Sequence, residues 1–480
     1  MAIKETLVDT FDLEGRWGLP DWPAEKWLHG KVHFDPTAGI SLKAEGLFGE
    51  MPKQIPSRPE EHRAVYGATS DSKRVTLLDV TGGLGGLSFG QAGANMSSRY
   101  HAMKMVVGEF VPSSTDLKCR SLSIRIHNLE EFFGRHGFEQ KFEAGASSVT
   151  YHLPQSVSLR LGGVPVAAEF RAGFNGDDFE RREIWQQAWF TITPDSEMEF
   201  DVLLRQIVPP LHYLVELAVG HRLAFLQIEA SSSRTDIEVN GNVLHDSVQI
   251  FLSQKKALPL PSREHPLRLL FTLGILGGDA PRYVENFHSA FGDLRDAFDF
   301  YFSLDPGSDT DVGLEHHFLS IVNAFESYHR IAGKAQFELP EAEHEARIQQ
   351  ILDSAPLLHR VWLKQKLEYS NEVRLRTRLR EIYDEQPDNV KTLLGSKKNF
   401  VGAIVDTRNY LTHHSEELKD RILDPLGIWL AVKKLRLVLQ VCFLRRMELA
   451  DEIICRMAER SADYQILHRN SDTVNEAQQK

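Results

Sequence analysis

Cysteine is scarce in this chain, which excludes a scaffold held together by disulfides. Only three cysteines occur among 480 residues, Cys119, Cys442 and Cys455. They form no C-x-x-C pair, and His316, His317 and His329 supply no metal-ligand spacing with them. The sequence therefore predicts a cytoplasmic protein, in a reducing compartment, with neither a metal nor a cofactor.

Long hydrophobic runs are missing as well, which excludes an obvious membrane span. The most apolar stretch, 428–444, is interrupted by Lys433, Lys434 and Arg436. The start of the chain leads into polar residues rather than into the apolar centre of a secretory signal. We therefore expect no membrane partner.

The chain also lacks an excess of positive charge. Its formal net charge is −12, which argues against coating nucleic acid over the whole surface. A local basic cleft stays possible, because binding follows the local potential more than the total charge. The length predicts at least two domains, and the 42% apolar and 25% charged content is ordinary for a globular protein.

The first half of the sequence has the alternation of short β-strands. Turn residues separate apolar runs, as where Asp35-Pro36-Thr37-Ala38-Gly39 joins two of them. Strands are expected at 28–34, 40–47, 66–68, 75–80, 99–110, 122–126, 148–153, 157–161, 164–170, 185–193, 224–228 and 248–252. A helix bent at Pro209-Pro210 is expected at 198–219. The pattern favours a sandwich or barrel.

For two other features of this half we prefer a structural role to a ligand-binding one. The glycine-rich stretch 82–87 lacks the Lys-Ser/Thr of a phosphate loop and predicts a turn or bulge. The tryptophans Trp17, Trp22, Trp27, Trp185 and Trp189 are expected in the core rather than around a pocket.

The second half has helical periodicity. Phe318, Ile321, Val322, Phe325 and Tyr328 form one apolar stripe. Further helices are expected at 339–352, 357–382, 390–411, 423–447 and 448–460, and the chain is broken at 305–309. The fold class is thus α+β multidomain. The predicted parts are a β-rich sensor or regulatory domain at 1–265, a helical connector at 266–311, an all-α bundle at 312–467 and a flexible tail at 468–480.

The most informative segment is Arg408-Asn409-Tyr410-Leu411-Thr412-His413. The guanidinium of Arg408 can bind phosphate oxygens with a planar fork of donors. The imidazole of His413 can move a proton near neutral pH, and the amide of Asn409 can orient either group. We predict these three as catalytic residues acting on a phosphodiester. The alternative is that Arg408 and His413 are cations at a helix end. His414, next to the pattern, has no assigned role.

A basic run precedes this segment. Arg374 and Arg378 share a predicted helix face, and Lys397 and Lys398 follow. We predict these four as contacts to RNA phosphates. The alternative is a solvated face paired with nearby acids. Asp406 and Glu326 are candidates to brace Arg408 through ion pairs.

The segment Arg408-Asn409-x-x-x-His413 resembles the signature of the HEPN superfamily. The matching first helix would be 317–330. Its motif Ala324-x-Glu326-x-Tyr328-His329-Arg330 is similar to sequences of the ApeA-like branch. The N-terminal cues Leu13-Glu14-Gly15-Arg16-Trp17 and Gly30-Lys31-Val32 resemble the β-rich domain that precedes HEPN in that branch.

The resemblance implies a function. Active HEPN domains are metal-independent ribonucleases, commonly dimeric, with motifs from two protomers lining one cleft. Members of this branch act in bacterial defence by abortive infection. The expected partners are therefore an RNA substrate, a second copy of the chain in a homodimer or higher oligomer, and a phage protein as trigger. The alternative is a HEPN module without catalysis, used for dimerisation or nucleotide binding beside a ligand-binding β domain.

Overall fold

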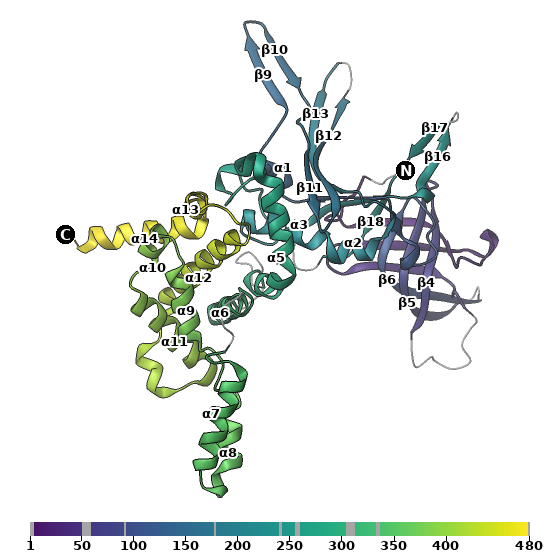
Figure 1. Ribbon diagram of the computed structural model, residues 1–480. Coiled ribbons are helices and arrows are strands. Elements are labelled where there is room, and N and C mark those ends of the chain that lie inside the picture. Colours follow the sequence, from purple (N-terminus) through teal and green to yellow (C-terminus); the bar gives the residue numbers. More distant parts are fainter. Residues whose placement is uncertain are drawn as a thin grey trace. The chain divides into compact units, whose positions relative to one another are not determined.

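The computed structural model describes residues 4–49, 59–90, 93–176, 179–239, 242–254, 260–303, 313–332 and 337–478. It confirms the predicted fold class, with a β-rich N-terminal half and a helical C-terminal half (Figure 1). The chain forms two compact units, Met1–Ser289 and Ala290–Lys480. The division falls within α5 (Ala280–Tyr301), inside the predicted connector. The predicted break at 305–309 lies outside the described residues.

Six strands of the first unit close into a barrel, because β6 pairs with β3 on one side and with β5 on the other. Around the barrel the strands are β6 (Gly93–Val107), β3 (Gly39–Glu45), β2 (Leu28–Asp35), β1 (Phe11–Gly18), β4 (Glu60–Thr69) and β5 (Arg74–Gly90). The register of β5 against β6 shifts between Leu84 and Gly86, which confirms the predicted bulge.

Trp17 fills the barrel and explains the glycines around it. Its indole N–H donates to the carbonyl oxygen of Gly30 at 3.0 Å. A Cβ added to Gly67 would lie 2.2 Å from Cζ3 of Trp17, so this position has no room for a side chain. Trp17 and Trp189 are buried, as predicted, whereas Trp185 is exposed.

An open sheet extends from the barrel, because the end of β6 also pairs with β18 (Val248–Phe251). The order continues through β15 (Phe225–Ser231), β8 (Ser121–Ile126), β13 (Arg182–Ile192), β12 (Val164–Gly176) and β11 (Val157–Leu161). Three small hairpin or ladder pairs accompany it, namely β9 (Phe138–Glu143) with β10 (Ala146–Tyr151), β16 (Asp236–Val239) with β17 (Asn242–His245), and β7 (Lys118–Cys119) with β14 (Met198–Glu199).

The predicted bent helix at 198–219 is two helices, α2 (Phe200–Gln206) and α3 (Val208–Val219). The break precedes the prolines, because Pro209 fits the first turn of α3, where an N–H is not needed. In the described part of the chain, 200–219 is the one stretch long and apolar enough to span a bilayer, and 61% of its most apolar window is buried. That burial is typical of a core helix.

The second unit is a helical bundle around α12 (Pro425–Arg445). The predicted apolar stripe from Phe318 to Tyr328 is buried on α6 (Leu314–Ile331), which packs on α12. The remaining helices are α7 (Glu341–Ser354), α8 (Leu357–Leu367), α9 (Leu375–Asp384), α10 (Asp388–Leu394), α11 (Lys397–His413), α13 (Asp451–Arg460) and α14 (Ala462–Gln478). In Figure 1, the α7–α8 hairpin projects from the other helices of this unit.

Two expectations about this half differ from the structure. The single helix at 357–382 is interrupted, because Asn371 exchanges hydrogen bonds of 2.9 and 3.0 Å with the backbone of Leu339. The helix at 390–411 is broken at Gly395, whose φ is +78°, and restarts at Lys397 after the capping residue Ser396. The tail predicted from 468 is helical as far as Gln478, where α14 ends, and its flexibility stays a prediction.

Candidate functional site

The predicted catalytic segment lies at the carboxyl end of α11. Ser396 caps the start of this helix by accepting from the backbone N–H of Asn399 at 3.4 Å. Helical geometry continues through His413, and His414 ends it with a left-handed backbone of φ +50°. Asn409 and His413 are four residues apart on a continuous helix, so they share a face.

Arg408 and Asn409 are in direct contact. Nη1 of Arg408 donates to Oδ1 of Asn409 at 3.4 Å, and both side chains are half-buried. The contact is of the kind expected for one of the two roles predicted for Asn409, orienting the guanidinium, and that role stays a prediction. His413 is exposed, as is Thr412, whose hydroxyl donates to the carbonyl oxygen of Arg408 at 2.7 Å. The structure therefore brings the cation and the amide together and leaves the imidazole open to solvent.

The buried face of α11 holds this end in place. Phe400, Val401, Ile404 and Val405 pack into the bundle. The hydroxyl of the buried Thr407 accepts from the backbone N–H of Leu423 at 3.1 Å, which ties the following loop to the helix. The motif therefore lies at the end of a helix that is packed into the bundle, and not on a loop.

The proposed bracing of Arg408 by Asp406 is wrong. Asp406 instead accepts from Nη2 of Arg376 on α9 at 3.4 Å. Residues two apart on a helix point to different faces, which explains why Asp406 does not reach Arg408. Within the described residues, no ion pair joins Arg408 to Glu326 either. Arg376 is therefore the basic side chain tied to the motif helix. Sequence reasoning selected its neighbours Arg374 and Arg378 instead.

A buried polar junction connects α6 to α9. His329 is fully buried, and Arg378 donates from Nη1 to its Nδ1 at 3.3 Å. Since a guanidinium can only donate, Nδ1 accepts, and Nε2–H donates to Glu381 at 2.7 Å. The neighbouring Tyr328 donates to the carbonyl oxygen of Cys442 at 3.2 Å. The first-helix residues that carry the family resemblance thus hold the bundle together.

This junction corrects the predicted role of Arg378. Its side chain is 3% exposed, and Nε donates to the carbonyl oxygen of Val373 at 2.8 Å. Burial lowers the pKa of the guanidinium, against the favourable charges of nearby glutamates. A group enclosed in this way is not exposed to RNA phosphates, because its donors face Val373 and His329 inside the bundle.

The other three predicted RNA contacts lie at the surface. Lys397 is paired with Asp384 at 2.7 and 2.9 Å. Arg374 precedes the first turn of α9, and Lys398 lies in the first turn of α11. Both are exposed, and neither has an ion pair within the described part of the chain. They therefore remain available for anions.

A cavity of about 340 Å³ lies beside the first half of α11. Its walls are mainly apolar side chains of α10, α11 and α12, with Lys434 among them. Nζ of Lys434 donates to the carbonyl oxygen of Leu394 at 3.1 Å, and burial lowers the pKa of this ammonium. None of the three predicted catalytic residues lines the cavity, so it is separate from the motif.

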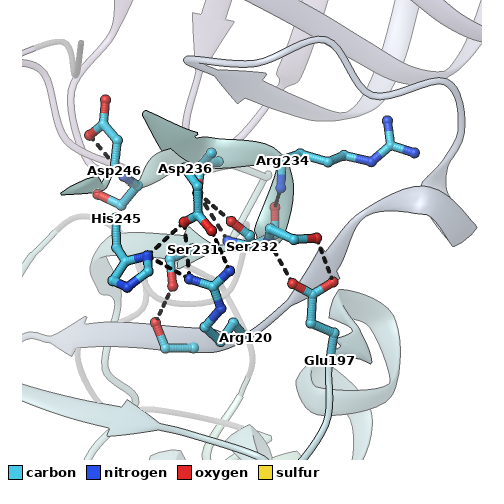
Figure 2. Close-up of polar contacts among 12 residues, drawn as sticks. Arg120, Glu197, Ser231, Ser232, Arg234, Asp236, His245 and Asp246 are labelled. Carbon is cyan, nitrogen blue, oxygen red and sulfur yellow. Dashed lines mark hydrogen bonds and ion pairs between the residues drawn. The ribbon is translucent and has the colours of Figure 1, made fainter. Parts of the chain in front are cut away.

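The first unit has a polar cluster of its own, shown in Figure 2. Arg120 makes two hydrogen bonds to the carboxylate of Asp236, at 3.0 and 2.7 Å, and Nδ1 of His245 lies 2.7 Å from the same carboxylate. The hydroxyl of Ser231 bonds to Ser121 rather than to this histidine. Since no serine among the described residues completes an Asp–His–Ser relay, the cluster is a clamp that holds the β16–β17 hairpin to the sheet.

Comparison with known families agrees with this architecture. Residues 12–287 match the ApeA N-terminal domain 1, and residues 319–453 match the Apea-like HEPN domain. The first match spans the barrel and the open sheet, and the second spans α6 to α12 with the motif. No curated protein and no solved structure matches the chain. The matches cover more than half of the sequence, and the chain therefore belongs to the ApeA-like HEPN family of anti-phage defence proteins.

Proposed function

We propose that this protein is a metal-independent HEPN endoribonuclease of the bacterial cytoplasm that acts in abortive infection. The observation that supports this most directly is the contact between Arg408 and Asn409 at 3.4 Å, with His413 on the exposed last turn of the same helix. HEPN domains are generally associated with nuclease activity.

The chemistry uses the nucleophile that RNA carries. The imidazole of His413 removes the proton from a 2′-hydroxyl, or donates one to the departing 5′-oxygen. Arg408, held by Asn409, neutralises the charge that builds on the pentacoordinate phosphorus. The 2′-oxygen attacks the phosphorus, and the bond to the 5′-oxygen breaks. The products are a 2′,3′-cyclic phosphate and a 5′-hydroxyl.

A homodimer would supply a second histidine. The motif of one chain offers one imidazole, whereas the reaction needs a base and an acid. The α7–α8 hairpin supports pairing, because it exposes a group of large apolar side chains: Leu357 (80%), Leu358 (86%), Val361 (71%) and Trp362 (56%). Apolar groups of this size on a surface mark interaction sites. We propose that they bind a second copy and so complete the site.

The decisive experiment is cleavage of total RNA in EDTA by wild type, His413→Ala and His316→Ala. His316 is an exposed histidine of α6 and serves as the matched control. Wild type and the control should leave cyclic phosphate ends, and His413→Ala should not. Intact RNA under triggering conditions, or equal cutting by His413→Ala, would favour an inactive dimerisation or nucleotide-binding module.

A free ribonuclease would poison its host, so we propose that the N-terminal domain keeps the activity low until a phage protein is present. Small changes in how two motifs meet would misalign Arg408 and His413. Co-expression of the full chain with individual phage proteins should produce growth arrest and RNA cleavage with the trigger alone. Equal cutting with and without phage proteins would contradict the gate.

A further inference from the structure

The outer face of the barrel has a compact group of cations that the proposed ribonuclease does not use. Lys31 on β2, Lys43 on β3 and Arg99 on β6 are direct cross-strand neighbours, since Lys31 pairs with Lys43 and Lys43 pairs with Arg99. All three side chains are exposed. They form a ladder of positive charge across three adjacent strands. Figure 1 draws the ribbons of these strands in purple and blue.

A second row lies two residues along the same strands. His33 pairs with Ser41, and Ser41 pairs with His101. Because side chains two apart on a strand share a face, these groups lie beside the ladder. The two rows border a hollow of about 380 Å³, within the usual size of a ligand site.

The ladder is unfavourable without a ligand. Like charges directly opposite in a sheet destabilise it, and here two such pairs are adjacent. Asp12 accepts from Lys31 at 2.7 Å and lies 2.7 Å from Nδ1 of His33, which accounts for one cation. Within the described residues, Lys43, Arg99 and His101 have no hydrogen bond or ion pair from their side chains. The lining of the hollow thus contains three cations and one carboxylate, on a protein whose net charge is −12.

The surroundings of the ladder favour a small anion over a long one. Asp12 and Glu14 border it along β1, and Glu45 follows Lys43 on the same face of β3. A nucleic-acid strand crossing the barrel would pass over these carboxylates. The lining of the hollow has no phenylalanine, tyrosine or tryptophan, and its aromatic rings are the imidazoles of His33 and His101. Adjacent strands are about 4.8 Å apart, so the three cations span about 10 Å, the scale of a few linked phosphates.

We propose that Lys31, Lys43 and Arg99 on the outer face of the barrel bind a small ligand with linked phosphate groups, of the class of a nucleoside triphosphate, recognised through its phosphates. The fork of Arg99 and the ammonium groups of the two lysines supply charge-assisted hydrogen bonds to the phosphate oxygens. His101 and Ser41 add hydrogen-bond donors at the second row.

The test is calorimetric titration of the full chain, in EDTA, with inorganic tripolyphosphate, ATP and a single-stranded RNA oligonucleotide. The proteins compared are wild type, the double variant Lys43→Ala/Arg99→Ala, and the control variant Lys141→Ala. Lys141 is an exposed lysine on β9 of the same unit. Tripolyphosphate and ATP should bind wild type and the control alike, and the double variant should bind both roughly tenfold more weakly or worse.

The folded state gives a second measurement. In the absence of ligand, the double variant should unfold at the same temperature as wild type or higher, since a repulsion has been removed. Tripolyphosphate should then raise the unfolding temperature of wild type, and raise that of the double variant by clearly less at the same concentration. No binding of tripolyphosphate, binding that the double variant retains, or binding of the RNA alone would each overturn the proposal.

Discussion

Arg376 donates to Asp406 across 3.4 Å and so joins α9 to the helix that carries Arg408 and His413. The two side chains are 41% and 25% exposed, so water screens the pair and its contribution to stability is small. The ion pair is important for its position, because Asp406 lies two residues before Arg408. The pair links the basic segment of α9 to the helix that carries the motif.

A double-mutant cycle measures this connection. We expect Arg376→Ala and Asp406→Ala to show a coupling of roughly 0.2–1 kcal/mol in the free energy of unfolding, measured in urea at low salt. The coupling should shrink as salt is added, because both groups are partly exposed. Additive effects of the two substitutions would mean that the pair does not join the helices in solution.

Substitutions at Arg408 separate charge from geometry. Arg408→Ala should lower the rate of RNA cleavage by roughly 10²–10³-fold, as when a donor to a developing oxyanion is removed. Arg408→Lys should recover only part of it, since an ammonium keeps the charge but loses the planar fork. Single-turnover rates with one RNA substrate supply the comparison, and circular dichroism checks the fold. Full activity of Arg408→Lys would show that charge alone is needed.

Asn409→Ala tests the positioning role of the amide. Losing the hydrogen bond from Arg408 frees the guanidinium without removing it. We therefore expect a smaller loss of cleavage than for Arg408→Ala, with the loss in the rate of the bound complex rather than in RNA affinity. A loss confined to affinity would instead make Asn409 an RNA contact.

The sequence predicted best where one local pattern decides the structure. The stripe from Phe318 to Tyr328 and the turn at 35–39 are as expected, because burial and turn chemistry are local there. The errors arise from distant partners. Asn371 interrupts a helix by bonding to Leu339, and Arg378 is buried against His329, 49 positions away. Strands were predicted within five of the six barrel strands, β1 being missed, and barrel closure depends on the pairing of β6 with both β3 and β5.

The candidate catalytic site shows the same contrast between local patterns, which were predicted correctly, and distant partners, which were not. Helical spacing placed Asn409 and His413 on one face, and the structure continues the helix through both. Proximity of Asp406 to Arg408 in the sequence suggested an ion pair, yet Asp406 bonds to α9. The pairing of Lys31, Lys43 and Arg99 was not foreseen, because it depends on the register of three strands.

The stability of the first unit should depend on pH through His127. Burial lowers the pKa of this imidazole to about 4, from 6.5, and Arg263 adds repulsion. Between these values the unfolded chain binds a proton that the folded chain does not, so stability falls as pH drops from 6.5 toward 4. The loss is on the order of 3 kcal/mol at most.

Urea unfolding across this pH range checks the prediction. His127→Leu should flatten the dependence, whereas a control at the exposed His136, His136→Leu, should leave it as in wild type. An equally steep fall in stability for His127→Leu would assign the effect to other groups.

Gly67→Ala should destabilise the barrel. The new methyl would lie 2.2 Å from Cζ3 of Trp17, which is fully buried and cannot move without repacking the core. Overpacking of this kind costs about 1–3 kcal/mol in the free energy of unfolding. Gly278→Ala is the control, since no atom lies within 4 Å of its added Cβ. If Trp17→Leu is combined with Gly67→Ala, the total loss should be smaller than the sum of the two, and an additive result would rule out the contact.

The exposed apolar side chains of the α7–α8 hairpin predict how activity depends on assembly. Leu358→Glu/Trp362→Glu places two charges where Leu358 and Trp362 are 86% and 56% exposed, so the folded chain tolerates them. A dimer interface would not, because each charge would be buried without a partner. We expect wild type to sediment as a dimer and the variant as a monomer, with cleavage reduced roughly tenfold or more.

Raising the protein concentration should restore part of this activity by mass action, which a damaged active site would not allow. The control is Leu267→Glu, since Leu267 is 73% exposed in the first unit, away from the hairpin in sequence. A monomeric variant that cuts RNA as fast as wild type would remove the need for a second His413, and one chain would then have to supply both acid and base.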